Sequence, residues 1–208
     1  MKIYDITAEI SDNLPVYGNE RPTVDRVFRL ENGDKFNFTK LGLSTHTGTH
    51  ADMPSHFIMN GATCDTIPLD YFYGPATLIR MANVANNITK ADLLHFDIKE
   101  GCILLIDTGQ SKYMRQGTFK EDFFALTPDA AQYLVERKIK TIGIDYLSID
   151  PYGTADFPAH MELLGNGIAV LEGLVLEGVP EGEYTLSALP LKVAGGDGSP
   201  VRAILVKP

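Results

Sequence analysis

The sequence has few of the residues that mark several protein classes. Its 208 residues include two cysteines, no tryptophan and no long uninterrupted apolar run. Without such a run we expect no transmembrane helix. The two cysteines, Cys64 and Cys102, are far apart, and a cytosolic setting would keep them reduced. We therefore expect them to pack as small buried apolar residues.

Cationic side chains are also scarce relative to anionic ones. The chain has 18 Lys and Arg against 27 Asp and Glu, a net charge of −9 and a pI near 5.0. This balance argues against nucleic acid or an anionic membrane as the main partner. The first residues, 1–9, carry an acid inside a short apolar stretch and have no signal-peptide core. We expect a cytoplasmic protein that acts on a small molecule.

The length is compatible with one large domain. A chain of 208 residues can bury a sizeable core. We find no internal repeat, low-complexity tract or clear linker in it. A single domain over residues 1–208 is the simplest expectation.

What is present is concentrated in one stretch. Three of the five histidines, with one aspartate, lie within eleven residues: His46, His50, Asp52 and His56. Imidazole and carboxylate are ligands that zinc and similar ions prefer. A lone histidine is more often a satisfied core or surface residue, but four such groups together favour a metal site.

The spacing of this stretch predicts a strand. All four positions are even, so an extended backbone would place them on one face. Gly48 shares that face and leaves room for an ion or substrate beside the backbone. A helix is disfavoured by the neighbouring threonines, by Gly48 and by Pro54. We expect the strand to break near Pro54 and to leave His56 on a loop over the site.

The rest of the pattern predicts an α/β fold. Two strands at 24–30 and 36–43 are joined by Asn32-Gly33-Asp34, which favours a hairpin. Buried-type strands at 101–107 and 141–150 flank a helix at 127–140 that begins with a strong Thr-Pro-Asp signal. This arrangement predicts a crossover and hence a partly parallel sheet.

The C-terminal part is predicted to contain three more strands. Glu172 interrupts the apolar face of a strand at 168–175, and a buried carboxylate is costly without a cation or metal beside it. Strands at 184–193 and 201–206 are expected to close the sheet, joined by a glycine-rich hairpin turn at 195–199.

The stretch His46-Thr-Gly-Thr-His50-Ala-Asp52-Met-Pro54-Ser-His56 resembles the signature of the cyclase-like metal-dependent hydrolases, which include bacterial kynurenine formamidase and the isatin hydrolases. Further matching segments follow in the family's order over essentially the full chain: Asp5-Ile-Thr, Ile67-Pro-Leu-Asp-Tyr with Gly74-Pro75, Gly143-Ile-Asp145, His160 with Leu164, Glu172-Gly-Leu, and Leu189-Pro-Leu with Val201-Arg-Ala.

The resemblance implies a two-metal site with imidazole and carboxylate ligands: His46, His50, Asp52, His160 and Glu172. By position, Asp52 would bridge the ions and His56 would be the catalytic histidine. The ions would be zinc, with manganese as the alternative, since this ligand set suits both. The implied fold is α/β, a mixed barrel-like sheet with flanking helices of the swivelling β/β/α type, assembled as a homodimer or higher homo-oligomer.

One segment departs from the family pattern. Formamidases of this type usually carry a tryptophan early in the chain, where this sequence has Val16-Tyr-Gly-Asn-Glu20. If that aromatic residue helps to bind an aryl substrate, Tyr17 must substitute for it or the substrate differs.

Three hypotheses for function follow. The first is an arylformamidase-like amide hydrolase that converts N-formylkynurenine to kynurenine and formate, a step of tryptophan catabolism, with metal-activated hydroxide and His56 as proton shuttle. The second is a hydrolase of a cyclic amide, as in isatin hydrolase, which the tryptophan departure motivates. The third is a metal-binding protein without catalysis, which a closed and saturated coordination sphere would support.

Overall fold

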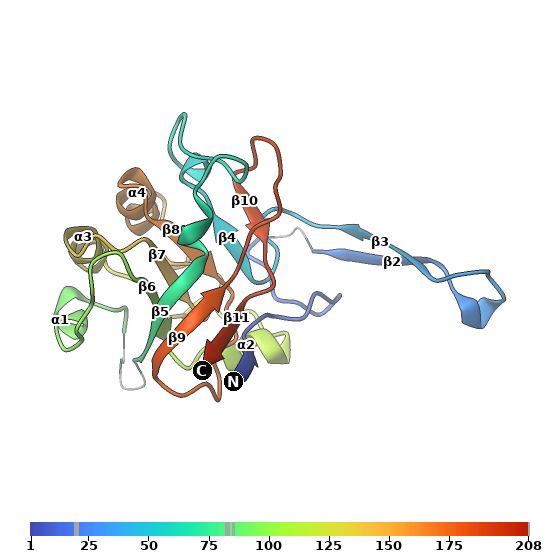
Figure 1. Cartoon of the computed structure of the whole chain (residues 1–208), viewed down its shortest axis with the longest axis horizontal. Coiled ribbons are helices and arrows are strands. Elements are labelled where there is room, and N and C mark those ends of the chain that lie inside the picture. Colours follow the sequence, from blue (N-terminus) through green and yellow to red (C-terminus); the bar gives the residue numbers. More distant parts are fainter. Residues whose placement is uncertain (19–20, 82–83, 85, 208) are drawn as a thin grey trace.

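A curled sheet of nine strands forms the centre of the protein, seen in a computed structural model that describes residues 1–18, 21–81, 84 and 86–207 (Figure 1). The strands, in chain order, are β1 (Lys2–Asp5), β4 (His50–Asp52), β5 (Tyr73–Arg80), β6 (Ile103–Asp107), β7 (Thr141–Ile144), β8 (Ala169–Glu172), β9 (Gly182–Ser187), β10 (Gly198–Pro200) and β11 (Ile204–Lys207). Their spatial order is β1-β11-β9-β5-β6-β7-β8-β4-β10. The central strands β5 to β8 are parallel, and the outer pairs are antiparallel.

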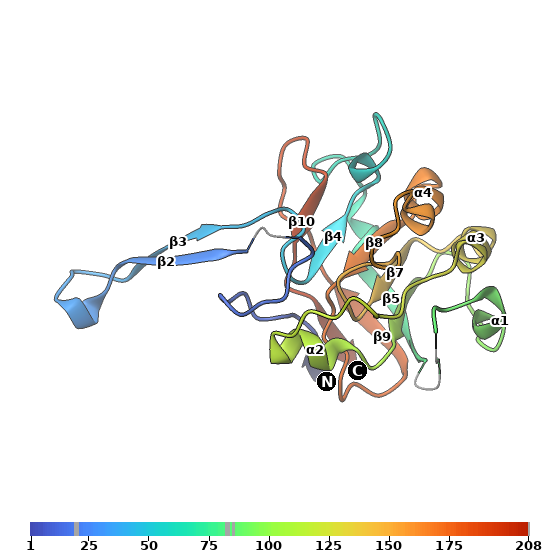
Figure 2. The ribbon, with the colours of Figure 1, turned by 180° about the vertical axis from the view of Figure 1, so that it is seen from behind.

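Helices cover the parallel part of the sheet. Figures 1 and 2 show three of the helices side by side along β5 to β8: α1 (Lys90–Leu93), α3 (Pro128–Glu136) and α4 (Pro158–Gly165). The fourth, α2 (Ser111–Gln116), lies apart from them, and short 3-10 turns form at η1 (Leu30–Asn32), η2 (Pro54–His56) and η3 (Leu69–Tyr71). Among the described residues, no helix has the length and apolar character needed to cross a bilayer.

Two apolar cores follow from the alternation of side chains along the buried strands. Leu104 and Ile142 belong to the core that also contains Leu134 of α3 and Leu163 of α4. Leu105, the neighbour of Leu104 on β6, belongs instead to the core on the other side of the sheet. A strand covered on both faces reads as a continuous apolar run, and all five residues of β6 are buried.

The expected fold class is confirmed. The sheet is mixed and curled into a half-barrel, and helices flank it. The predicted crossover is also present, since β6 and β7 pair in parallel and α3 lies between them in the chain. At the start of α1, the Thr89 side chain accepts a hydrogen bond from the Asp92 backbone N–H, and the Asp92 carboxylate accepts one from the Thr89 backbone N–H.

The expectation of one strand through residues 46–56 is wrong. Strand geometry is confined to β4. Gly48 has φ +65°, a left-handed value that turns the chain before the strand, so His46 lies in a turn. Pro54 ends the extended segment and begins η2, which carries His56. The predicted break near Pro54 is therefore confirmed.

Two other strand predictions need correction. The strand predicted at 141–150 ends at Ile144, because the Asp145 carboxylate that follows accepts hydrogen bonds from the backbone of Thr108, Gln110 and Ser111. These contacts fix the start of α2, which the sequence pattern did not predict. Residues 195–199 do not form a hairpin turn between the closing strands. They lead into β10, which pairs with β4 instead.

The predicted hairpin of residues 24–43 is present, but it forms a separate ribbon. Strands β2 (Thr23–Phe28) and β3 (Phe38–Gly42) pair with each other in a two-stranded sheet. Figures 1 and 2 show this ribbon, here called the arm, projecting from the body.

A close approach between two loops predicts one sensitive position. A Cβ on Gly173 would lie 2.3 Å from the carbonyl oxygen of Gly48, whereas a Cβ on Gly178 would meet nothing within 4 Å. Both glycines have positive φ. We expect Gly178→Ala to lower the free energy of unfolding by about 1–2 kcal/mol through backbone strain alone. Gly173→Ala should cost roughly 1–3 kcal/mol more because of the clash. Urea denaturation of both variants measures the difference, and equal losses would contradict this contact.

Candidate metal centre

Strand pairing brings the first ligand-type groups together. His50 and Asp52 lie at the two ends of β4, and β4 runs antiparallel to β8 with His50 opposite Glu172. All three side chains are buried. His50 Nε2 lies 3.3 Å from Asp52 Oδ1 and 3.5 Å from Glu172 Oε2. The carboxylate that interrupts an apolar strand therefore faces an imidazole, as its placement predicted.

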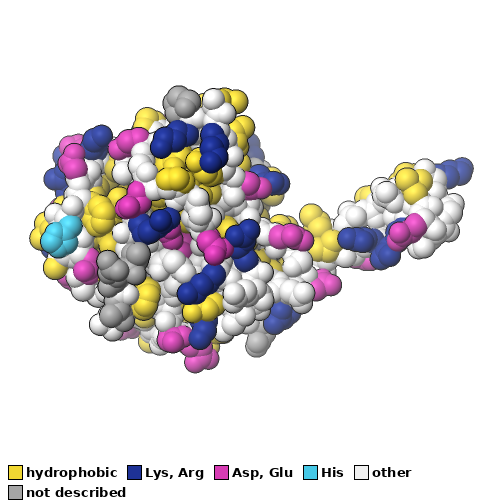
Figure 3. Space-filling model, turned by 90° about the horizontal axis from the view of Figure 1, so that it is seen from below, with side chains coloured by type: hydrophobic (Ala, Val, Ile, Leu, Met, Phe, Trp, Pro, Cys, Tyr) yellow, Lys and Arg dark blue, Asp and Glu magenta, His cyan; other side chains and the backbone are white. Residues whose placement is uncertain are grey.

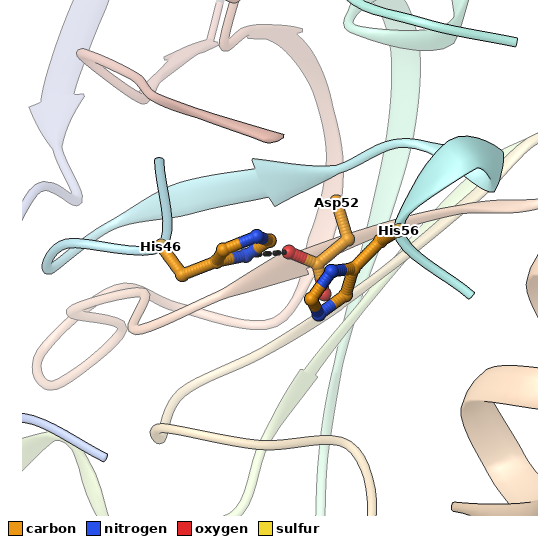
Figure 4. Close-up of side chains that lie close together, drawn as sticks. All are labelled: His46, Asp52 and His56. Carbon is orange, nitrogen blue, oxygen red and sulfur yellow. Dashed lines mark hydrogen bonds and ion pairs between the residues drawn. The ribbon is translucent and has the colours of Figure 1, made fainter. Parts of the chain in front are cut away.

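The turn before β4 and the 3-10 turn after it bring two further imidazoles to Asp52 (Figure 4). His46 Nδ1 lies 2.7 Å from Asp52 Oδ1. The His56 ring stacks on the His46 ring with centroids 4.0 Å apart. His56 is thus held over the site by the turn that Pro54 starts.

The fourth imidazole of the cluster belongs to His160 on α4. His160 Nε2 lies 3.4 Å from Asp52 Oδ2 and 3.3 Å from Glu172 Oε1. Its Nδ1 is 2.7 Å from Asp150 Oδ2. Asp150 also accepts hydrogen bonds from the backbone of Ala159 and His160. One carboxylate therefore both fixes the first turn of α4 and sets the orientation of the His160 ring.

Asp52 is the shared member of the cluster. Its Oδ1 faces His46 and His50, and its Oδ2 faces His160. Two sets of ligand atoms each lie within 4.8 Å of one another and share Asp52: His46, Asp52 and His56, and His50, Asp52 and Glu172. A carboxylate with one oxygen toward each of two places is suited to bridging two ions. The first set includes His56, which the sequence resemblance implies to be the catalytic histidine and not a ligand.

The donor set fits a divalent cation. Asp52 Oδ2 is buried and has no hydrogen-bond partner among the described residues, which is costly for a carboxylate without a cation nearby. The far nitrogens of the imidazoles are held by other groups: His50 Nδ1 by the Gly48 carbonyl at 2.9 Å, and His160 Nδ1 by Asp150. When these nitrogens carry the protons and the rings are neutral, both Nε2 atoms offer lone pairs to a cation placed between them and the carboxylates.

The electrostatics agree with a site that attracts positive charge. Burial lowers the pKa of His50, but the Asp52 and Glu172 carboxylates outweigh it and raise that pKa to about 10. Burial also lowers the pKa of His160. The hydrogen bonds and charges of Asp150, Asp52 and Glu172 outweigh that effect and raise the pKa well above its usual value. His56 differs, because burial dominates there and lowers its pKa. His56 is therefore the imidazole best kept neutral at pH 7.

A cavity of about 370 Å³ opens directly onto the cluster. Its wall contains apolar and aromatic side chains, namely Val16, Tyr17, Phe57, Leu147 and Phe157. Tyr17, the residue that the sequence suggests for substrate binding, lies on this wall, and its ring lies 5.4 Å from that of Tyr152. A larger cavity of about 750 Å³ lies between residues 5–14 and 114–117, but no histidine lines it.

Two carboxylates of the site were not found from the sequence. Asp150 was placed at the end of the strand predicted at 141–150, and Asp197 in the hairpin turn predicted at 195–199. Asp197 Oδ2 lies 3.1 Å from His46 Nε2 and 3.4 Å from His56 Nδ1, so it contacts both stacked rings. No spacing signal links Asp197 to residues 46–56. Its place follows from the pairing of β10 with β4, which brings residue 197 beside Met53.

Comparison with known proteins agrees with this geometry. Residues 4–151 match the Cyclase family. The kynurenine formamidase of Geobacillus thermodenitrificans (strain NG80-2) is 38% identical over 205 residues, which cover 98% of this chain and 96% of that protein.

Solved structures give the same picture. A predicted metal-dependent hydrolase from Bacillus stearothermophilus superposes with a TM-score of 0.86 at 37% identity, over 98% of this chain and 97% of the other. Isatin hydrolase A from Labrenzia aggregata superposes with a TM-score of 0.87 at 28% identity, over 100% and 94%. The chain therefore belongs to the Cyclase family of metal-dependent hydrolases.

Proposed function

We propose that this protein is a metal-dependent amide hydrolase that cleaves an arylformamide, with N-formylkynurenine as the substrate. Water would add across the amide C–N bond and give kynurenine and formate. The observation that carries the proposal is a buried cluster of imidazoles and carboxylates at the end of a cavity walled by aromatic side chains. The 38% identity to a kynurenine formamidase supports the same substrate.

The ligands we assign to two divalent ions share Asp52. His46 and His50 would hold the first ion, His160 and Glu172 the second, and Asp52 would bridge them. Ions bound there supply Lewis acidity, which lowers the pKa of water and polarises the amide carbonyl. Zinc is favoured over manganese by the general affinity order for nitrogen and oxygen ligands.

His56 is the group we assign to proton transfer. It lines the cavity, and its lowered pKa keeps the ring neutral near pH 7, so it accepts a proton from water and donates it to the leaving nitrogen. Asp197, beside His56 Nδ1, holds the ring in place. Tyr17, Phe57 and Phe157 would contact the aryl ring of the substrate.

A cyclic amide is the second candidate substrate. Isatin hydrolase A shares the fold at 28% identity, and this chain lacks the tryptophan usual in formamidases. Ring opening of such a substrate needs the same attack on an amide carbonyl, and a cavity of about 370 Å³ has room for either compound.

The setting we propose is a cytoplasmic homodimer in tryptophan catabolism. The whole chain would act as one domain, which the pairing of the first strand, β1, with the last, β11, supports. The net charge of −9 suits a protein that meets small molecules rather than nucleic acid.

The first test is hydrolysis of N-formylkynurenine before and after chelation, with elemental analysis of the same sample. We expect stoichiometric metal, formate release that stops on chelation, and recovery when zinc is restored. Isatin is the parallel substrate. If the protein holds metal, releases no formate and opens the isatin ring, a cyclic amide replaces N-formylkynurenine as the proposed substrate. A protein without metal would contradict the proposed metal site.

A variant at His56 separates proton transfer from metal binding. We expect His56→Ala to keep its metal content and to lose about 10²- to 10⁴-fold in kcat, the usual range for a general acid–base group. His95→Ala is the control, because His95 is exposed and follows α1, away from the lining of the cavity. Loss of metal from the His56 variant would instead place His56 among the ligands, as one of the two atom sets permits.

The raised pKa of His50 predicts proton-linked metal binding. With a pKa of about 10, the imidazole is protonated at pH 7 in the metal-free protein, and an ion must displace that proton. The Kd for zinc should therefore fall as the pH rises from 6 to 9, by about tenfold per pH unit for each proton released. Calorimetry in buffers of different ionisation enthalpy counts the protons. A Kd independent of pH would contradict the assignment of His50 as a ligand.

A further inference from the structure

Three consecutive residues that follow β7 surround the metal centre, and the role of one of them is still open. The Ile149 backbone N–H donates to Glu172 Oε1 at 2.7 Å. Asp150 Oδ2 lies 2.7 Å from His160 Nδ1. The third residue, Ser148, lines the cavity and is only 6% exposed. Neither the metal site nor the proton transfer assigned above uses its side chain.

Hydrogen bonds on both sides of Ser148 fix its place beside Glu172. The Gly173 backbone N–H donates to the Tyr146 carbonyl at 2.7 Å, and the Ile149 N–H donates to the Glu172 carboxylate. The chain is thus tied to the end of β8 two residues before Ser148 and again one residue after it. Ser148 is therefore held at the part of the cavity wall where Glu172 lies.

The Ser148 hydroxyl group has a donor that the protein does not use. Its oxygen accepts a hydrogen bond from the Asp150 backbone N–H at 3.2 Å, and the described part of the chain offers its proton no acceptor. Thr49, another buried hydroxyl residue, instead donates to the Gly173 carbonyl at 2.6 Å. Since buried hydroxyl groups normally donate as well as accept, the Ser148 proton is available to a molecule in the cavity.

Few other donors face this cavity. Its lining includes no Lys or Arg among the described residues, and such side chains lie on the outer surface in the view of Figure 3. Two further hydroxyl groups line it, but Tyr17 is 42% exposed, and Ser44 is half-buried with its oxygen close to the His46 backbone N–H. Ser148 is the buried hydroxyl donor of the lining, and a hydrogen bond shielded from water is stronger than an exposed one.

Amide hydrolysis creates a need for such a donor. Attack on the carbonyl carbon moves negative charge onto the carbonyl oxygen, and a donor already in place stabilises that charge more than it stabilises the neutral substrate. Leu147, Phe57 and Phe157 line the same cavity and lower its polarity, which strengthens the hydrogen bond.

We propose that Ser148 is a catalytic residue that donates a hydrogen bond to the oxygen of the scissile amide carbonyl. The hydroxyl group keeps its proton, and no covalent bond to the serine forms. The inference rests on the amide hydrolysis proposed above. It holds for a formyl amide and for a cyclic amide, because both present a carbonyl oxygen to the attack.

Steady-state hydrolysis of N-formylkynurenine by the zinc-loaded protein tests the proposal. Ser148→Ala should lower kcat by about 10²- to 10³-fold, the usual effect of removing one such donor. KM should change by less than about threefold, because the hydrogen bond strengthens in the transition state. Ser148→Thr keeps the hydroxyl group and should recover most of the loss.

Ser111→Ala is the matched control. Ser111 is buried, and its oxygen likewise accepts a backbone N–H, that of Glu177 at 3.1 Å, but it does not line the cavity. We expect this variant to keep the wild-type kcat. If Ser148→Ala fails to fold, Ser148→Cys takes its place, since a thiol has nearly the same shape and is a much weaker donor.

A thioamide distinguishes donation to the substrate from support of Asp150, whose N–H also loses its acceptor in Ser148→Ala. Sulfur is a weak acceptor, so with N-thioformylkynurenine the ratio of wild-type to Ser148→Ala kcat should be at least about tenfold smaller than with the oxygen substrate. The Kd for zinc should be the same in both proteins. A role through Asp150 and His160 would instead give equal ratios and a higher Kd.

Equal ratios, weaker zinc binding or an unchanged kcat would overturn the assignment of Ser148 and leave the hydrolysis of the amide standing. If the wild type opens isatin and releases no formate, isatin replaces N-formylkynurenine in the same comparison, and we expect the same loss of kcat. A wild type that cleaves neither compound would refute the proposed reaction, and the role of Ser148 with it.

Discussion

The buried carboxylate of Asp52 is the group around which the site is built. Three imidazoles lie within 3.4 Å of its oxygens, and its pKa is held well below the usual value by His50, His160 and His46 despite complete burial. An isolated carboxylate in such a place would cost several kcal/mol. The surrounding cations, whether imidazolium groups or metal ions, stabilise the buried Asp52 carboxylate.

The mixed sheet explains how one carboxylate meets so many partners. β4 lies between β8 and β10, and both pairings are antiparallel. The end of β8 therefore meets the start of β4, which sets Glu172 opposite His50. The start of β10 meets the end of β4, which brings Asp197 close to the same cluster. A fully parallel sheet would place strand ends of one kind at this edge and would leave these groups apart.

The two halves of the site have different supports. His46, His50, Asp52 and His56 come from one continuous segment and depend on local turns at Gly48 and Pro54. His160 depends on α4 and on Asp150, which lies on the loop before that helix. Ring orientations are therefore set by hydrogen bonds outside the cluster, and such supporting contacts commonly tune metal affinity.

The sequence alone determined the chemistry of the centre and the class of the fold. The dense window at 46–56 predicted a metal site, Glu172 was found because a carboxylate in an apolar strand needs a partner, and the strong helix start at Thr127 predicted the crossover. These are local signals, carried by residue type and short spacing. The resemblance to a known family added His160, for which the residues by themselves gave little reason.

Tertiary structure alone decided which distant groups complete the site. The sequence around Asp150 and Asp197 gives no signal that they belong to a site, because an acidic residue in a loop or a glycine-rich turn is an ordinary surface residue in most chains. Residues 195–199 were wrongly assigned to a hairpin turn for the same reason. β10 pairs with β4, more than 140 residues earlier in the chain, and local sequence periodicity does not predict a pairing between such distant segments. The projection of the arm from the body is likewise a property of the folded shape, since its alternating apolar residues would suit a buried hairpin equally well.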